Sequence, residues 1–323
     1  MQTPEEAVEL TASYVRICGG GIFFIVAYNL LSAIFRGLGD SRSPLLFVLV
    51  ACVVNVAGDL LLVAGFGMDA AGAAIATVFA QAVSVLFAVV ILLKKELPFS
   101  VAREDVRINP QCGKFLGIGL PLALQEFLTL LSFLALCAFV NRLGLTASSG
   151  YGIASKIVNF AMLIPSALMQ SMASFVAQNV GAGNQQRAKK PRFTGIGVGL
   201  VFGCVVFVLV LLKGDALATI FSTDAEVVQK GFEYLKGFAP GTIVTAVLFS
   251  MVGYFNGNNQ TLWAMILGIV QTLLVRLPLS YCMSIQPDAS LAKIGLAAPI
   301  STVVGIALNI AFYIYWNRKN ADS

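Results

Sequence analysis

Nine runs of about 20 mostly apolar residues follow one another along the chain, and this pattern limits the fold more than any other feature. A helix needs about 20 apolar residues to cross the hydrocarbon core of a bilayer. It also satisfies its own backbone hydrogen bonds, which lipid cannot do. The pattern predicts an all-helical polytopic membrane protein with nine transmembrane helices. The predicted spans are 15–35, 45–66, 71–93, 115–140, 152–177, 195–212, 235–255, 262–283 and 294–316.

The composition excludes several classes of function. Only 11% of the 323 residues are charged, whereas soluble domains carry roughly 25%. The chain has no histidine and no nucleotide-binding loop, so we expect no enzyme activity and no cofactor. No soluble domain exists to bind nucleic acid, and no obligate protein partner is evident. The expected partners are the lipid bilayer and a small-molecule substrate.

An internal repeat links the first span to the seventh. Residues 3–37 align with residues 223–257 without a gap, at an offset of 220. The identities fall at an acidic helix start, within an apolar span and at a glycine-containing exit. Residue 223 follows an apolar run, whereas residue 3 follows nothing, so we expect the chain to lack three preceding helices. The identical pairs are Thr3/Thr223, Glu6/Glu226, Val8/Val228, Tyr14/Tyr234, Gly21/Gly241, Phe35/Phe255 and Gly37/Gly257.

The longest polar stretch, residues 94–114, separates three spans from six. It predicts three parts: residues 1–94 as the remainder of an N-terminal lobe, 95–114 as a cytoplasmic linker, and 115–319 as a C-terminal lobe. Lysines and arginines near the span ends favour one side by thirteen to six, and the richer side of a membrane protein is normally the cytoplasmic one. We therefore expect a multi-pass protein of the bacterial cell membrane with a cytoplasmic C-terminus.

Four motifs together resemble those of the multidrug and toxic compound extrusion (MATE) transporters. Residues 175–184 read FVAQNVGAGN, and residues 35–41 read FRGLGDS. Residues 55–59 read NVAGD and are followed by GAAIAT at 72–77, while residues 276–279 read RLPL. Their order and spacing are similar to those of spans four to twelve in the twelve-span family fold. The resemblance covers essentially the whole chain.

The resemblance implies a partial two-lobed, inverted-V transporter without its first three helices. It also implies a secondary active antiporter that exports amphipathic or cationic drugs in exchange for Na⁺ or H⁺. Two alternatives remain open. One is a lipid-linked oligosaccharide flippase of the same superfamily, which needs a strongly basic central cavity. The other is a truncated fragment that transports nothing.

Charged residues inside spans are costly in a bilayer and are functional candidates by default. Asp59 lies in the second span, one helical turn after Asn55, so both side chains share a face. Thr77 lies at a similar depth in the third span, and Asn29 in the first span is a further candidate. In the family this set resembles a cation site, which implies bound Na⁺ or a proton at Asp59. The alternative is an Asp–Asn hydrogen bond that fastens the second span to the third.

A second set of charged and polar residues falls within the C-terminal lobe. Glu126 and the adjacent Gln125 lie near the middle of the fourth span, with Lys156 in the fifth and Arg276 in the eighth. Counting along the helices places the three charged residues within one or two turns of depth. The resemblance implies a cavity lined by these four residues. The alternative is a static ion pair between Glu126 and one of the two cations.

Two glycine-rich turns follow predicted spans on the expected cytoplasmic side. Gly37 and Gly39 lie in the first, and Gly181 and Gly183 in the second. Glycine allows the positive φ that a tight helix exit requires. The turns are therefore candidates for a cytoplasmic gate, and otherwise they are simple helix exits.

Overall fold

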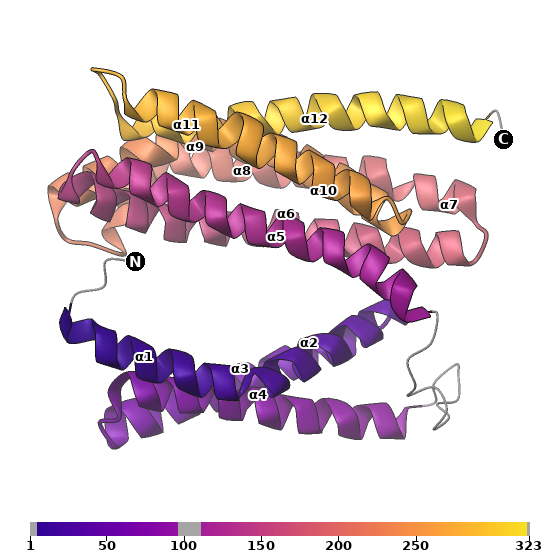
Figure 1. The fold of residues 1–323 in the computed structure, drawn as a ribbon, viewed down its shortest axis with the longest axis horizontal. Coiled ribbons are helices and arrows are strands. Elements are labelled where there is room, and N and C mark those ends of the chain that lie inside the picture. The colour runs from indigo at the N-terminus through magenta and orange to yellow at the C-terminus, as the bar shows by residue number, and fades with distance from the viewer. Residues whose placement is uncertain (1–4, 96–110, 322–323) are drawn as a thin grey trace. The chain divides into compact units, whose positions relative to one another are not determined.

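The computed structural model describes residues 5–95 and 111–321, and those residues form helices joined by turns. The helices make two compact units, Met1–Arg107 and Ile108–Ser323 (Figure 1). The boundary falls inside the predicted linker, of which residues 96–110 lie outside the described part, as do Thr3 and Pro4 of the predicted helix start. Each unit is described separately.

The described residues of unit 1 form four α-helices and one π-helix. The helix α4 packs against α1, α2 and α3. The π-helix η1 continues α3 directly, and the two together make one candidate span, Arg42–Gly65. The elements are α1 (Glu5–Gly20), α2 (Ile22–Gly37), α3 (Arg42–Asp59), η1 (Leu60–Gly65) and α4 (Asp69–Lys94).

The first predicted span is bent, which corrects the expectation of one continuous helix over 15–35. The segments Val8–Gly20 and Ile22–Gly37 meet at an angle of 53°. Three consecutive glycines, at 19, 20 and 21, occupy the break, and each weakens a helix interior. A side chain at position 21 would also collide with Val78 of α4, so the bend lies where the two helices approach closely.

Unit 2 is built around one central helix, α9 (Ala225–Gly257), which packs against α6, α8 and α12. The segments α10, η3 and α11 follow one another without a gap and form a single candidate span. The remaining elements are α5 (Gln111–Asn141), α6 (Leu145–Gly181), α7 (Gln185–Lys189), α8 (Pro191–Thr219), α10 (Thr261–Ile269), η3 (Val270–Arg276), α11 (Leu277–Ser284) and α12 (Leu291–Ala321).

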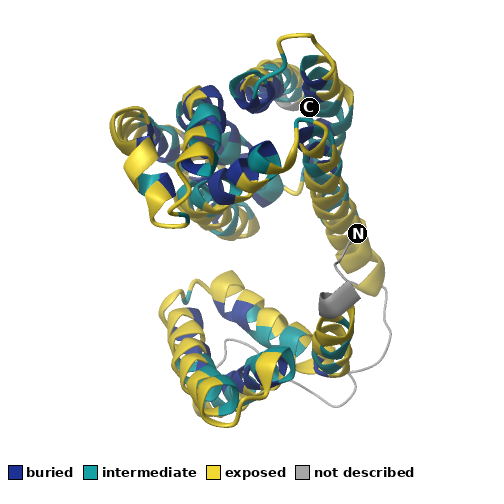
Figure 2. Cartoon of the chain, turned by 90° about the vertical axis from the view of Figure 1, so that its left-hand side faces the viewer, coloured by how far each residue is buried: buried dark blue, intermediate teal, exposed yellow. Residues whose placement is uncertain are grey.

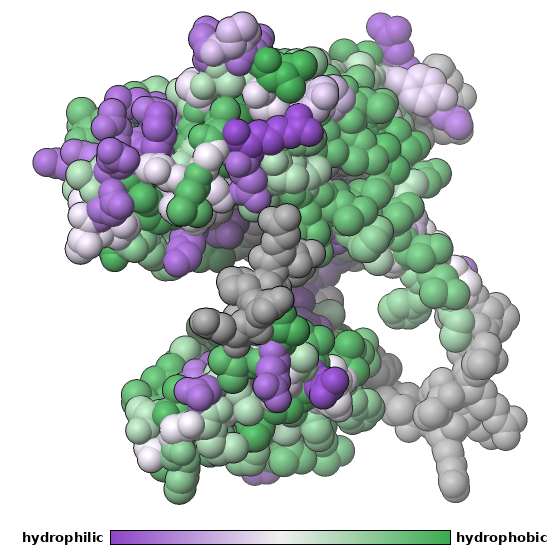
Figure 3. Space-filling model, turned by 60° about the vertical axis from the view of Figure 1, so that its left-hand side comes forward, coloured by the Kyte–Doolittle hydropathy of each residue, from purple (hydrophilic) through white to green (hydrophobic). Residues whose placement is uncertain are grey.

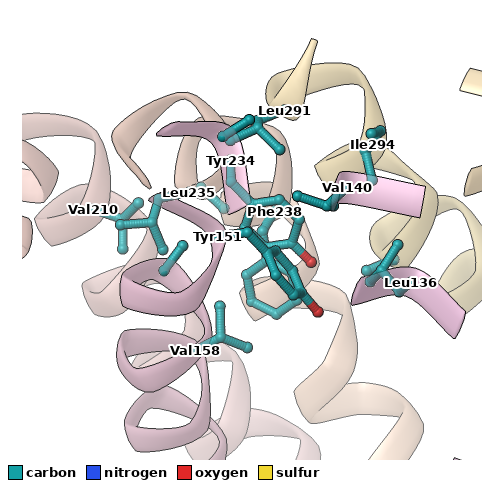
Figure 4. Close-up of a cluster of buried hydrophobic side chains, with 14 residues drawn as sticks. Leu136, Val140, Tyr151, Val158, Val210, Tyr234, Leu235, Phe238, Leu291 and Ile294 are labelled. Carbon is teal, nitrogen blue, oxygen red and sulfur yellow. The ribbon is translucent and has the colours of Figure 1, made fainter. Parts of the chain in front are cut away.

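Glycines let α9 approach its neighbours closely. A Cβ atom at Gly237 would collide with the backbone oxygen of Ala292 on α12, and one at Gly295 would meet the backbone oxygen of Tyr234. Small residues at such contacts allow helix backbones to pack tightly in membrane proteins. The main apolar core lies around this contact and includes Tyr151, Tyr234 and Phe238 (Figure 4).

The outward surfaces of the helices are apolar. Figure 2 shows buried residues on the sides of helices that face other helices, and Figure 3 shows apolar side chains over much of the visible surface of each unit. In the described part of the chain, eight helices are long and apolar enough to cross a membrane, or nine if the bent pair is one span. The prediction of an all-helical membrane protein is therefore confirmed.

Candidate functional site

Two members of the polar set predicted in unit 1 are in contact. The amide nitrogen of Asn55 on α3 donates to the hydroxyl oxygen of Thr77 on α4 at 3.4 Å. The Thr77 hydroxyl in turn donates to the backbone oxygen of Ala73 at 2.9 Å. Asn55 and Thr77 thus form one polar link between the second and third spans, and the Ser84 hydroxyl forms another by donating to the backbone oxygen of Phe47 at 2.8 Å.

Asp59 is the last residue of α3 and directly precedes η1. Its Oδ1 atom is buried, and no hydrogen-bond partner for it exists among the described residues. Burying a carboxylate oxygen without a partner is unfavourable, and π-helical turns are rare and frequent at functional sites. The arrangement leaves an acceptor within the span that a proton or a cation can satisfy.

Asn29 is not joined to this cluster by any hydrogen bond that the described residues form. Its side-chain amide is exposed and donates to the backbone oxygen of Ile25 at 2.8 Å, within its own helix. Sequence reasoning also missed Gln81, one turn after Thr77 on α4. Its Oε1 atom is buried and unpaired in the described part of the chain, as is the Ser32 hydroxyl. A polar residue at i+4 from Thr77 in an apolar span was the available signal.

Unit 2 encloses a cavity of about 400 Å³ between α5, α6, α9, α12 and the α10–η3 span. Its apolar walls include three phenylalanines and two methionines, at positions 133, 238, 249, 162 and 169. Among the described lining residues, two are charged, Glu126 and Arg276. The other polar lining residues include Gln125, Thr129, Asn159 and Gln271.

Glu126 and Arg276 lie at different levels of this cavity. Glu126, Thr129 and Phe133 follow an i, i+3, i+7 pattern on one face of α5, as their place in the cavity wall requires. The Arg276 guanidinium lies over the Phe133 ring, 4.7 Å from its centroid. Seven residues of helix separate Phe133 from Glu126, a rise of about 10 Å. In the described structure neither charge belongs to an ion pair, which gives no support to the static-pair alternative.

Lys156 does not line the cavity, contrary to the expectation that it joins Glu126 and Arg276 there. It is exposed, and its Nζ atom lies 5.4 Å from the centroid of the Phe221 ring. Counting along a helix gives depth but not the face on which a side chain lies. Gln125 does line the cavity, and its side chain packs against the Cα position of Gly268. Gln271, which sequence reasoning missed, packs in the same way against Gly305.

The two glycine-rich turns share one geometry. Gly39 and Gly183 have φ angles of +82° and +74°. In each turn the next amide donates to the carbonyl five residues earlier: Asp40 to Phe35 at 2.9 Å, and Asn184 to Asn179 at 2.8 Å. Both turns are therefore Schellman motifs that cap the C-termini of their helices. The repeat of residues 3–37 ends in the same way, since Asn259 has φ +63° and Gln260 N donates to Phe255 O at 2.9 Å.

Asp40 ties the first turn to the end of α4. Its carboxylate forms an ion pair with Lys95 and accepts hydrogen bonds from the backbone amides of Arg42 and Ser43 at 3.0 and 3.1 Å. Lys95, followed by the Ser43 hydroxyl, holds the pKa of Asp40 well below its ordinary value. The Lys95 ammonium also lies 5.5 Å from the centroid of the Phe35 ring.

Candidate spans with a buried carboxylate oxygen that has no partner among the described residues, together with a charged cavity, are typical of membrane transport proteins. A sequence model of the MatE family matches residues 1–61 and 121–282. The chain therefore belongs to the MatE family, the multidrug and toxic compound extrusion transporters.

Relatives of known sequence and structure match between 76% and 99% of this chain. The probable multidrug resistance protein YpnP of Bacillus subtilis (strain 168) is 29% identical over 320 residues, which is 99% of this chain and 71% of YpnP. The FAD transporter of Shewanella oneidensis is 27% identical over 252 residues, 76% of this chain and 55% of that protein. A solved structure of an outward-facing multidrug resistance MATE family transporter matches with a TM-score of 0.90 at 20% identity, over 99% of this chain and 71% of that one. The match to the solved structure shows the fold alone, because the two sequences are 20% identical.

Proposed function

We propose that the protein is a secondary active antiporter that exports amphipathic, often cationic compounds in exchange for Na⁺ or H⁺. The observation that carries the proposal is the Asp59 carboxylate, whose Oδ1 atom is buried within a span without a partner in the described part of the chain. A carboxylate in this position is stabilised when it takes up a proton or a cation. Binding and release at Asp59 therefore couple ion movement to a change in the helix that carries it.

The neighbouring side chains fit a small cation as well as a proton. Asn55 and Thr77 supply amide and hydroxyl oxygens, the kind of ligand that Na⁺ and other hard cations take. The Asn55 side chain contacts Thr77 through its amide nitrogen, so the amide oxygen of Asn55 is not used in that contact. These side chains lie on α3 and α4, which pack together.

The cavity of unit 2 suits an amphipathic cargo. Phe133, Phe238 and Phe249 supply aromatic walls, and Glu126 supplies a negative charge. An organic cation gains from both an aromatic face and a carboxylate. The relatives are named for multidrug resistance and for FAD transport, so the range of cargo is part of the proposal.

The cavity favours this function over the flippase alternative. A flippase for lipid-linked oligosaccharides needs a strongly basic cavity. Among the described lining residues, Arg276 is the one basic side chain, and Glu126 offsets its charge. Lys156, the second cation that sequence reasoning placed there, is exposed elsewhere on α6.

Transport in everted membrane vesicles tests the proposal, because export from the cell becomes uptake into such a vesicle. The vesicles are prepared from cells that express the gene. Uptake of ethidium into the vesicles is followed under an imposed Na⁺ or H⁺ gradient. We expect Asp59→Asn to abolish gradient-driven uptake while the protein remains in the membrane at wild-type yield. Asp69→Asn, an exposed isosteric change at the start of α4, is the matched control and should transport normally. Wild-type rates in Asp59→Asn would refute the coupling role of Asp59.

A further inference from the structure

Arg276 carries a charge in a candidate span and forms no ion pair with any described carboxylate. It is also half-buried. An intramembrane cation of this kind is expensive and usually marks a functional site. Two carboxylates of unit 2 already have cationic partners: Glu233 pairs with Lys230, and Asp288 pairs with Lys293.

Two tyrosine hydroxyls lie beside this guanidinium. Tyr151 on α6 and Tyr234 on α9 are 6% and 2% exposed, and their rings meet edge to face with centroids 5.0 Å apart. Figure 4 shows both hydroxyl groups on the same side of the apolar core. The Arg276 side chain faces the Tyr234 hydroxyl and lies within electrostatic range of Tyr151. Three helices thus bring one guanidinium and two hydroxyl donors to one place.

This group of donors adjoins the cavity of unit 2. Arg276 lines the cavity, as does Phe238, whose ring stacks on Tyr234 with centroids 6.4 Å apart. Phe133 supports the guanidinium from α5. Arg276 therefore meets the cavity beside aromatic rings, about 10 Å along α5 from Glu126, whereas Tyr151 and Tyr234 are not among the residues that line it.

We propose that Arg276 forms an anion subsite in the wall of this cavity, for the carboxylate, sulfonate or phosphate group of an aromatic cargo molecule, and that the buried Tyr151 and Tyr234 position its guanidinium. The planar guanidinium donates two parallel hydrogen bonds to such a group. The proposal rests on the proposed function only in taking the ligand as cargo.

The subsite also explains how one cavity accepts cargo of either sign. Glu126 faces a cationic group at its level, and Arg276 faces an anionic group two helical turns away. The two charges are too far apart to neutralise each other by contact. A molecule with a positive and a negative group at matching spacing occupies both.

Equilibrium binding to the purified protein in lipid nanodiscs tests the subsite without any ion gradient. The probes are naphthalene-2-sulfonate and its neutral analogue naphthalene-2-methanol. We expect the sulfonate to bind the wild type at least about tenfold more tightly than the alcohol, since charge-assisted hydrogen bonds are strong. Arg276→Gln should remove this preference but keep binding of the alcohol, which shows that the cavity is intact.

Conservative variants and a matched control separate the subsite from general charge effects. Arg276→Lys should keep part of the preference, and Tyr234→Phe and Tyr151→Phe should each reduce it several-fold. Lys156→Gln removes a cation on α6 that, like Arg276, lies over a phenylalanine ring, and it should leave the preference unchanged. A full preference in Arg276→Gln, or an equal loss in Lys156→Gln, overturns the proposal. If ethidium export fails while the sulfonate preference follows Arg276, the antiport proposal fails and the subsite stands.

Discussion

At the scale of single residues, the two acidic side chains inside the spans have different surroundings. One carboxylate oxygen of Asp59 is enclosed without a partner in the described structure, whereas Glu126 is exposed to the cavity of unit 2. An enclosed carboxylate gains most from taking up an ion. A carboxylate on a cavity wall is free to meet cargo. In the proposed function, coupling therefore falls to unit 1 and cargo binding to unit 2.

Glu126→Gln should fold normally and lose most export of organic cations. Because Glu126 has no ion pair in the described structure, its removal leaves no buried cation unpaired. Breaking a static buried pair would instead cost about 3–5 kcal/mol and reduce the folded yield. The measurement is folded yield and ethidium uptake in the same vesicles. Glu9→Gln, an exposed isosteric change on α1, is the control. Loss of yield in Glu126→Gln alone would restore the ion-pair interpretation.

At the scale of helices, close backbone contacts and turn geometry hold each unit together. The contact between α9 and α12 depends on Gly237 and Gly295. The exits of α2, α6 and α9 use the same hydrogen-bond pattern, with glycine or asparagine at the position of positive φ. Both features fix elements that form the walls of the cavity or the end of a span. Substitutions at these positions should therefore lower the stability of the folded unit more than they change binding or transport.

Gly237→Ala should destabilise unit 2 by about 1–3 kcal/mol, the usual cost of overpacking. The new methyl group would collide with the backbone oxygen of Ala292, which cannot rotate away as a side chain can. Thermal unfolding in detergent measures the effect. Gly117→Ala on α5 adds its methyl group to open space and should be neutral or slightly stabilising. Equal melting temperatures for the two variants would show that α9 and α12 are not held at this distance.

Asp40→Asn should weaken the link between the α2–α3 turn and the end of α4 by about 1 kcal/mol. The expected loss of stability is small because Lys95 is partly exposed, so that solvent screens its ion pair with Asp40. The folded-state pKa of Asp40 lies below its ordinary value of 3.8. The Asp40 carboxylate therefore makes its full contribution to stability above its ordinary pKa of 3.8, and this contribution is lost as the pH falls below that value. The difference in melting temperature between wild type and Asp40→Asn should be largest near roughly pH 7 and should close in acid. A difference that persists in acid would contradict the assignment.

At the scale of the whole molecule, the sequence predicts the spans well because nine apolar runs leave the chain few other choices. The bend at Gly21 was not predictable from these runs, since membrane helices tolerate glycine and the close neighbour Val78 is distant in sequence. Glu126, Gln125 and Arg276 were found because polar groups are conspicuous in apolar spans. Lys156 was misplaced because position along a helix does not fix the face, which depends on packing.

In the proposed function, the two units have different roles. Unit 1 contains the ion candidates Asp59, Asn55 and Thr77, and unit 2 contains the cavity. Antiport requires that the ion and the cargo bias the same equilibrium between conformations, and such coupling is reciprocal. An ion gradient that drives cargo movement must therefore have a counterpart, in which a cargo gradient drives ion movement.

Ion flux driven by a cargo gradient in proteoliposomes tests this account most directly. The purified protein is reconstituted with dyes for Na⁺ and for pH inside the vesicles, and an ethidium gradient is the only driving force. We predict Na⁺ or H⁺ movement opposite to that of ethidium, present in the wild type and in Asp69→Asn and absent in Asp59→Asn. Ethidium movement with no counterflow of either ion, or the same counterflow in Asp59→Asn, would contradict the account.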